Sequence, residues 1–381
     1  MPAPGSTSSL RAANQHRVVA ALRAESDLSQ AEIARGTGLA PATVSNIVKE
    51  LVSLGLLETT SGAGRRGATV RISLGAGLVA GVDFGHSHVQ VAIGDLAGRV
   101  LATDERPLAN DHPHEEGLAL AHELLDDLLV TQHASLDDVR AVGIGLPAPI
   151  GRDGILDSGS ILPGWVGVHA EKAGSAQFGV PTLADNDANL GALAEATVGA
   201  GVGVSSMAYV KLSSGVGCGL VLDGRLYRGG LGTAGELGHL TMDENGPLCR
   251  CGSRGCLEAY VGGEALTEQF ATRRSELTVA DFVSLALTGD TGARRLVEDA
   301  GRYLGRAAAV LANVLGLELI VIGGDMAAAG DLLLDGVRDG LRRHALVQVS
   351  SSVKVTPAAL GHASSAIGSV LLALDAVELP I

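Results

Sequence analysis

Apolar residues near the start of the chain recur at the spacing of an α-helix. Val18, Val19 and Leu22 fall on one helical face and predict a helix over residues 14–24. A similar pattern returns after Pro41, a residue that suits the first position of a helix, and ends at Gly55. The residues of this second apolar face are Val44, Ile47, Val48, Leu51 and Leu54. Both segments are therefore expected to be amphipathic helices packed on one small core.

A third helix is predicted between these two by its end signals. Ser29 and Glu32 form a capping box, in which the Ser29 hydroxyl accepts from the Glu32 amide and the Glu32 carboxylate reaches back. Gly36 and Gly38 are expected to end this helix in a short turn. Ala40 then lacks the side-chain oxygen with which Ser or Asp would cap the following helix.

Two helices joined by a tight glycine turn are typical of a helix-turn-helix, whose second helix enters the major groove of DNA. The exposed face of that helix carries short polar residues and one lysine: Thr43, Ser45, Asn46 and Lys49. Asn46 suits a bidentate pair with adenine, and Lys49 suits a phosphate. Thr43 and Ser45 suit base edges or phosphates.

Residues 56–73 predict two short strands around a glycine-rich tip. Arg65 and Arg66 lie on this tip, where they would read the minor groove or the DNA backbone. The segment therefore resembles the wing of a winged helix-turn-helix. The alternative is that the winged helix docks another protein.

After residue 74 the pattern changes to short apolar strands with tight turns. Residues 77–103 predict three strands, followed by a helix over 116–130 and a strand over 141–149. Near Ser205 a second set of strand, glycine turn and strand begins. Two halves of this kind indicate an internally duplicated α/β fold.

Length and composition fit a multidomain globular protein. The chain has 381 residues, of which 46% are hydrophobic and 18% charged, so two or three domains with large cores are expected. No apolar run reaches the ~18 residues of a membrane span, and the N-terminus lacks the apolar segment of a signal peptide. These features predict a cytoplasmic protein without membrane insertion.

Charge is divided unevenly along the chain. Residues 1–74 carry eight Lys or Arg and five acids, which gives a net charge of +3. The remaining residues carry 20 basic and 37 acidic groups, or −17, within a total of −14. This division predicts a basic nucleic-acid-binding head joined to an acidic body with another role.

Three cysteines lie within the stretch CRCGSRGCLEAY, residues 249–260, and raise the alternatives of a redox site, a disulfide and a metal clip. Cys249 and Cys251 are too close in sequence to bridge easily, and a reducing compartment disfavours any disulfide. The fourth cysteine, Cys218, stands in a glycine-rich strand segment and is expected to be a small buried side chain.

Four stretches together resemble the ROK family, named for repressors, open reading frames and kinases. They are VDFGHSHVQVAIGD (82–95), ADNDANLGALAEA (184–196), GELGHL (235–240) and CRCGSRGCLEAY (249–260). The resemblance implies a two-lobed body of the actin and sugar-kinase ATPase fold. One branch of this family consists of transcription regulators with a winged helix-turn-helix ahead of the body.

The resemblance also implies a ligand set for one structural zinc ion: His239, Cys249, Cys251 and Cys256. One imidazole and three thiolates make a complete tetrahedral set, and a closed site of this kind is structural rather than hydrolytic. The metal interpretation is therefore favoured over a disulfide.

Sugar-contacting residues follow from the same resemblance: Asn186, Asp187, Glu236, His239 and Glu258. Carboxylates, an amide and an imidazole are able to bind a ring of hydroxyls. Asn186 and Asp187 also precede a helical stretch, so helix capping is the alternative role for one of them.

In the kinases of the family, the residue at Asp187 would be the general base that deprotonates the sugar hydroxyl. Both expected phosphate loops depart from the kinase pattern. His86 replaces the second glycine of DxGGT, and Ser213, Ser214 and Cys218 depart from GTGxGGG. We therefore expect no catalysis and no ATP cofactor, with a sugar kinase carrying an added DNA-binding domain as the alternative.

The expected architecture is α/β, with a winged helix-turn-helix over 1–74, a first lobe over 75–184 and a second lobe over 185–362. The terminal helix within 363–381 is expected to pack back on the first lobe. The expected function is a regulator of carbohydrate genes, a repressor or less often an activator. It would act as a homodimer or dimer of dimers on a double-stranded operator and respond to a sugar or sugar-phosphate effector.

Overall fold

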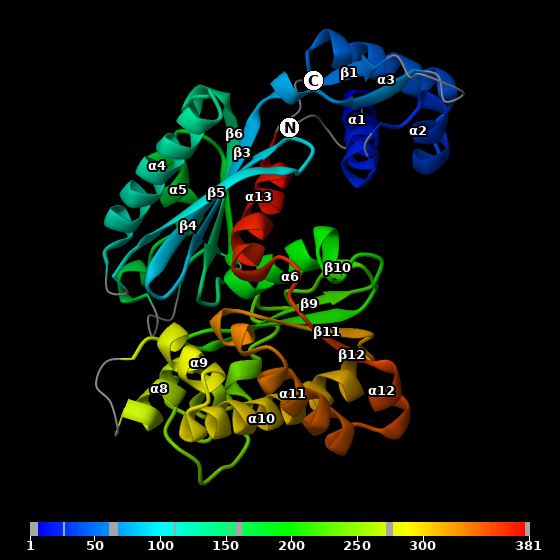
Figure 1. The fold of residues 1–381 in the computed structure, drawn as a ribbon. Coiled ribbons are helices and arrows are strands. Elements are labelled where there is room, and N and C mark those ends of the chain that lie inside the picture. Colours follow the sequence, from blue (N-terminus) through cyan, green and yellow to red (C-terminus); the bar gives the residue numbers. More distant parts are fainter. Residues whose placement is uncertain are drawn as a thin grey trace.

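The computed structural model describes residues 7–25, 27–60, 68–109, 112–151, 153–156, 162–271 and 277–377. A small head lies beside one end of a body made of two lobes (Figure 1). Among the described helices, none is both long enough and apolar enough to cross a membrane.

The head is a helical domain closed by a two-stranded antiparallel sheet. Its elements are α1 (Thr7–Ala24), α2 (Gln30–Thr37), α3 (Pro41–Ser53), β1 (Leu57–Thr60) and β2 (Thr69–Ile72). The predicted winged helix-turn-helix is thus confirmed, although the first helix begins seven residues earlier than residue 14. The turn between β1 and β2, with Arg65 and Arg66, lies outside the described residues.

Most end signals of the head helices act as predicted. The Ser29 hydroxyl accepts from the Glu32 amide while the Ser29 amide donates to the Glu32 carboxylate, and Gly38 ends α2 with a φ of 67°. Ala40 caps α3 without a side-chain bond. The prediction for Leu54 is wrong, because this residue follows the last turn of α3 and is 46% exposed instead of buried.

The first lobe is built on a five-stranded sheet in the order β5-β4-β3-β6-β7. The three strands β3, β4 and β5 are antiparallel, whereas β3, β6 and β7 are parallel. The strands and main helices are β3 (Leu78–Phe84), β4 (His88–Asp95), β5 (Val100–Pro107), α4 (His114–Thr131), β6 (Val139–Leu146), α5 (Ala170–Phe178), β7 (Thr182–Asn186) and α6 (Asp187–Val198).

The second lobe repeats this topology in the order β10-β9-β8-β11-β12. Its strands are β8 (Met207–Leu212), β9 (Val216–Leu222), β10 (Arg225–Leu226), β11 (Leu319–Gly323) and β12 (Lys354–Pro357). Its helices are α7 (Glu258–Val261), α8 (Gly263–Ala271), α9 (Val279–Leu287), α10 (Thr291–Leu315), α11 (Asp331–His344) and α12 (Val347–Ser352). The same strand order in both lobes bears out the predicted duplication. The expected lobe boundary at 184/185 falls inside β7 and stays a prediction.

Helix α13 (Ser364–Ala376) returns from the second lobe and packs on the first sheet, between that sheet and α6. Successive side chains of β3 point to opposite faces of the sheet, so both faces are buried. Ala80 and Val82 belong to the core under α4, whereas Val79 belongs to the core that includes α13. In Figure 1, α13 runs from the level of α6 toward the head.

The head and the first lobe share one apolar core. Val18 and Leu22 of α1 belong to the same buried cluster as Leu96 of the β4–β5 turn and Leu374 of α13. Arg23 adds a polar tie, because its Nε donates to the Leu96 carbonyl oxygen over 3.0 Å. The head is therefore attached by packing as well as by the chain.

Candidate ligand cleft, metal cluster and DNA-reading helix

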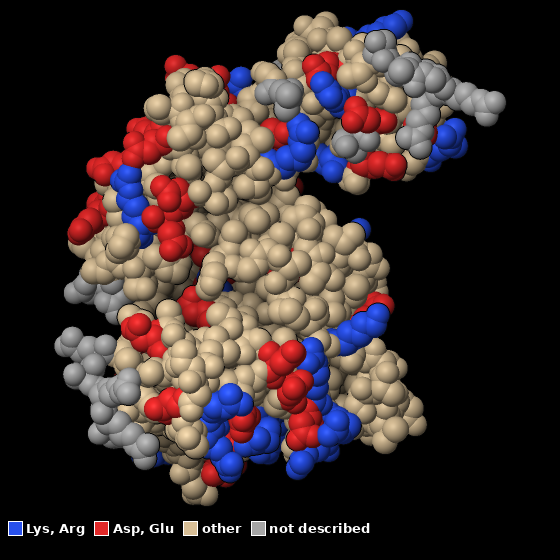
Figure 2. Space-filling view, in the orientation of Figure 1, with Lys and Arg blue, Asp and Glu red and all other residues tan. Residues whose placement is uncertain are grey.

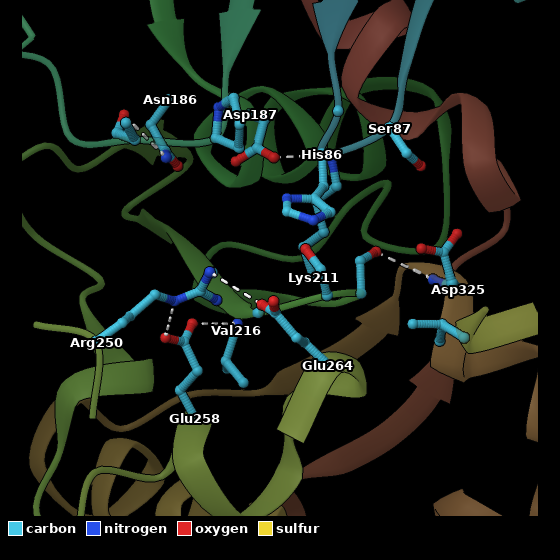
Figure 3. A pocket seen from close by; sticks show the side chains of 18 of the residues that line it. His86, Ser87, Asn186, Asp187, Lys211, Val216, Arg250, Glu258, Glu264 and Asp325 are labelled. Atoms are coloured by element: carbon cyan, nitrogen blue, oxygen red, sulfur yellow. Dashed lines mark hydrogen bonds and ion pairs between the residues drawn. The ribbon is translucent and has the colours of Figure 1, made fainter. Parts of the chain in front are cut away.

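A cavity of about 680 Å³ opens between the two lobes. The first lobe lines it with the β3–β4 turn and the start of α6, and the second lobe with the β8–β9 turn, the cysteine loop and α9 (Figure 3). The predicted sugar-contacting residues Asn186, Asp187, Glu236, His239 and Glu258 all line this cavity. The structure thus brings together residues that are up to 72 positions apart in the sequence.

Lys211 of β8 lies at the centre of the cleft and was missed in the sequence. Its ammonium Nζ is 2.8 Å from an Asp187 carboxylate oxygen and 3.3 Å from Oδ2 of Asp83, which lies on β3. It also donates to the Ser365 hydroxyl over 3.1 Å. One side chain of the second lobe therefore contacts three elements that belong to or pack on the first lobe.

The environment keeps the Lys211 ammonium charged. Burial alone would lower the pKa of Lys211, but the carboxylates of Asp187 and Asp83 outweigh it and raise this pKa. The pKa of Asp187 is raised, because burial outweighs the opposing charge of Lys211. Because both partners are buried, the charge of each depends on the other.

Asn186 acts as the N-cap of α6, so the capping alternative is realised for this residue. Its Oδ1 accepts from the amides of Ala188 and Asn189, and its Nδ2 donates to the carbonyl oxygen of Ala148. The neighbouring Asp185 forms an ion pair with Arg228 of the second lobe at 2.6 Å. The polar atoms of Asn186 are thus engaged within the protein, while Asp187 faces the cavity (Figure 3).

Two carboxylates from the second lobe complete the cleft. Glu258 accepts from the Val216 amide at 2.9 Å and pairs with Arg250 at 2.7 Å. Burial would raise the pKa of Glu258, but its contact with Arg250 lowers it instead. Burial, together with the charges of Asp187 and Glu258, raises the pKa of Glu236 to about 7. Arg250, a residue inside the cysteine stretch, was also missed in the sequence.

The two expected phosphate loops face each other across the cleft. Gly85 begins the β3–β4 turn and its amide donates to the His88 carbonyl oxygen at 2.9 Å, while the His88 ring fills the space beside it. On the opposite side, the Ser213 hydroxyl accepts from the Asp325 amide at 3.1 Å. Ser213 therefore occupies a position where the kinase pattern has glycine, and His86, which occupies another such position, lines the cavity. Leu162 and Trp165, which lie before α5, are fully buried in the first lobe and do not line the cavity.

His239, Cys249, Cys251 and Cys256 converge beside the cleft, with all four donor atoms within 4.8 Å of one another. The Sγ atoms of Cys251 and Cys256 are 3.7 Å apart, and Cys249 Sγ is 3.8 Å from His239 Nδ1. Ligands about 2.3 Å from a tetrahedral centre have similar separations, so the cluster could bind a metal ion. Cys218 is buried in β9, outside this cluster.

The outer face of α3 presents the residues expected to contact DNA. Asn46 and Lys49 are exposed, and Thr43 and Ser45 are half-buried. Its inner face is buried against α1 and the wing strands, so these side chains are held on a fixed support. Figure 2 shows Lys and Arg side chains in blue at several places on the head, interspersed with Asp and Glu in red.

Comparison with known proteins agrees with this geometry. A profile described as the ROK family matches residues 79–376, and one described as the MarR family matches residues 10–67. The xylose repressor of Bacillus subtilis (strain 168) is 27% identical over 374 residues and covers 95% of each chain. A glucokinase of Halalkalibacterium halodurans is 34% identical over 308 residues, which cover 76% of this chain and 92% of that protein.

A solved ROK family transcriptional regulator, described as a homolog of the E. coli MLC protein, shares the whole fold. It superimposes with a TM-score of 0.81 and covers 97% of this chain and 96% of that chain at 24% identity.

Proposed function

This chain belongs to the ROK family, and from that premise we propose that it is a sugar-responsive, DNA-binding repressor of transcription. The observation that carries the proposal is the union of a winged helix-turn-helix with a ligand cleft lined by carboxylates. The relative with a repressor's name matches 95% of this chain, head included, whereas the glucokinase matches 76%. The presence of the head therefore distinguishes the repressor relative, which matches it, from the glucokinase, which matches a smaller share of the chain.

The cleft favours binding without catalysis. In a kinase the carboxylate of Asp187 would accept a proton from the sugar hydroxyl. Here that carboxylate pairs with Lys211 at 2.8 Å, and the same ammonium lies near Asp83. A cation already fixed between these two carboxylates competes with the proton transfer and with a metal–phosphate group. The altered phosphate loops also argue against binding of the ATP phosphates, so ATP is not proposed as a cofactor.

We assign the sugar hydroxyls to Asp187, Glu236 and Glu258, with His239 at the edge of the site. His239 turns Nδ1 toward Cys249, and its Nε2 is 3.9 Å from the Glu236 carboxylate. One imidazole would thus serve both the metal and the cleft. Asn186 would act mainly by capping α6.

The four-residue cluster is proposed to hold a structural zinc ion. The donor set of three thiolates and one imidazole fits zinc and leaves no open position for a substrate. When bound, the ion would fix the loop that carries Arg250 and thereby the position of Glu258.

In the proposed DNA complex, α3 enters the major groove. Asn46, Thr43 and Ser45 would face base edges or phosphates, Lys49 a phosphate, and Arg65 and Arg66 of the wing the minor groove or backbone. Two heads of a homodimer, or of a dimer of dimers, would bind the half-sites of a near-palindromic operator.

The test is operator binding by the full chain in gel-shift assays with D-xylose, D-glucose, N-acetylglucosamine and their phosphates. We expect nanomolar binding to an operator selected from genomic DNA, and a change of roughly 5–150-fold with at least one sugar. Absence of any DNA binding would overturn the regulator assignment, and binding that no sugar alters would overturn the sensor assignment.

A sugar kinase is the second candidate, because the glucokinase is the relative with 34% identity. Its test is ADP production with ATP and glucose, N-acetylglucosamine, mannose or xylose. We expect none. Turnover that disappears in Asp187→Asn would establish the kinase instead.

A further inference from the structure

Helix α13 touches both the cleft and the head, the two parts that a sugar-responsive regulator has to connect. At its first turn, the Ser365 hydroxyl accepts from Lys211 Nζ at 3.1 Å and donates to the Asp187 carbonyl oxygen at 3.0 Å. Ser365 is buried and exposes 2% of its surface. The start of α13 is therefore bonded directly to the Lys211 ammonium and to the backbone of Asp187 at the centre of the cleft.

The middle of α13 packs on the first lobe through backbone rather than through long side chains. A Cβ atom on Gly81 of β3 would collide with the Ala366 carbonyl oxygen, and one on Gly143 of β6 with the Ser369 carbonyl oxygen. On the opposite side, a Cβ on Gly368 would collide with the Leu190 carbonyl oxygen of α6. Contacts this close leave no flexible side chain to absorb a displacement, so α13 has to follow α6 and the sheet.

The last turns of α13 reach the attachment point of the head. Leu371 and Leu374 lie against Gly98 in the β4–β5 turn, and the adjacent Leu96 carbonyl oxygen accepts from Arg23 of α1. Asp375 acts on the same guanidinium, since burial lowers the pKa of Arg23 and the Asp375 charge partly offsets this. Leu374 also shares its core with the apolar residues of α1.

We propose that Lys211 and α13 form the mechanical link that carries the state of the cleft to the DNA-binding head. A sugar hydroxyl that donates to Asp187 competes with Lys211 for the same carboxylate, so the ammonium shifts toward its remaining partners, Asp83 and Ser365. Ser365 then moves the first turn of α13, and the helix moves together with α6, the first sheet and the attached head relative to the second lobe. The regulatory meaning rests on the proposed function, whereas the link itself is a property of the folded chain.

The first experiment needs neither DNA nor sugar. Hydrogen–deuterium exchange is measured on the full chain for the wild type, Lys211→Met and Ser365→Ala. Lys354→Met, an exposed lysine on β12 of the same lobe, and Ser351→Ala, an exposed serine on α12, are the matched controls. We expect at least threefold faster exchange in α13 and in residues 18–24 of α1 for the two cleft variants alone. Faster exchange confined to β8 and α6, with α1 unchanged, overturns the link.

The second experiment measures coupling. The operator affinity of Ser365→Ala is determined with and without the sugar that acts on the wild type, and its sugar affinity by calorimetry. We expect the operator affinity without sugar and the sugar affinity without DNA each to stay within about threefold of the wild-type values. The ratio of operator affinities with and without sugar should fall toward unity. A general loss of stability would not change that ratio. An unchanged ratio in Ser365→Ala overturns the proposal, whereas a wild type that binds no DNA or no sugar overturns the proposed function and leaves the exchange experiment to decide the link.

Discussion

At the scale of single residues, the cleft is organised by pairs of charged groups that lie far apart in the sequence. Lys211 and Asp83 are 128 positions apart, and Asp185 and Arg228 are 43 apart. Both pairs join one lobe to the other. Since a buried ion pair is costly to leave half-formed, relative movement of the lobes must keep or replace these partners. A bound sugar, with many hydroxyls, is a suitable replacement.

The metal cluster gives the first prediction at this scale. The double variant Cys249→Ser/Cys251→Ser should lose the zinc that we expect in the purified wild type, since two of its four ligands are gone. Sugar affinity should fall at least about tenfold, because the loop that places Arg250 and Glu258 is no longer fixed. Metal analysis and calorimetry are the measurements, with Cys218→Ala, a cysteine outside the cluster, as the control for zinc content. Unchanged zinc in the double variant would contradict the ligand assignment.

His362 gives a second prediction, on proton binding. Its Nδ1 is 3.3 Å from Asp325, and the hydrogen bond with that carboxylate raises the pKa of His362 above 6.5. The pKa of Asp325 is lowered below its ordinary value of 3.8, because the contact with His362 outweighs burial. The pair should therefore stabilise the fold between these two pKa values. Its contribution should be lost as pH rises through the pKa of His362 or falls through that of Asp325.

The measurement is an NMR titration of the His362 ring. In Asp325→Asn the pKa of His362 should return toward 6.5, and the stability difference from the wild type should disappear at high pH. A His362 pKa that is the same in the variant and in the wild type would show that Asp325 does not raise the pKa of His362.

At the scale of helices and strands, local signals predicted most of the fold. The capping box at Ser29 and the apolar spacing of α3 act over a few residues, so they are legible in the sequence. Lys211 was missed because its partners come from other elements, and no local pattern marks a lysine on a strand as an interlobe contact. Leu54 was assigned to the core because the periodicity was extended one residue beyond the end of α3.

The start of α3 supplies the prediction for this scale. Ala40 offers no side-chain oxygen to the free amides of the first turn. Ala40→Ser and Ala40→Asp should each stabilise the helix by about 0.5–2 kcal/mol, seen as slower hydrogen exchange in residues 41–53. The two variants should differ in DNA affinity, because only the Asp carboxylate repels phosphates at the N-terminus of the reading helix. Equal operator affinity for both would argue that the start of α3 does not face DNA.

At the scale of the whole molecule, the chain combines two lobes of the same topology with a head whose core is continuous with the first lobe. The basic charge of the head and the acidic charge of the body then have separate effects on binding. The head attracts phosphates, while the body, at −17, repels DNA that approaches elsewhere. This division favours binding through α3 and the wing.

The salt dependence of operator binding tests this division and the number of heads together. Each phosphate contact contributes about −0.9 to the slope of log K against log salt concentration. Lys49, exposed on α3, would contact one phosphate per head. Lys49→Ala should therefore make the slope less negative by about 1.8 if two heads bind together and by about 0.9 if one binds alone. Lys354→Ala, far from the head on β12, is the control and should leave the slope unchanged. A slope that Lys49→Ala does not alter would remove this residue from the DNA interface. A change between these two values that grows with protein concentration would show that the second head binds only as the chain dimerises on the operator.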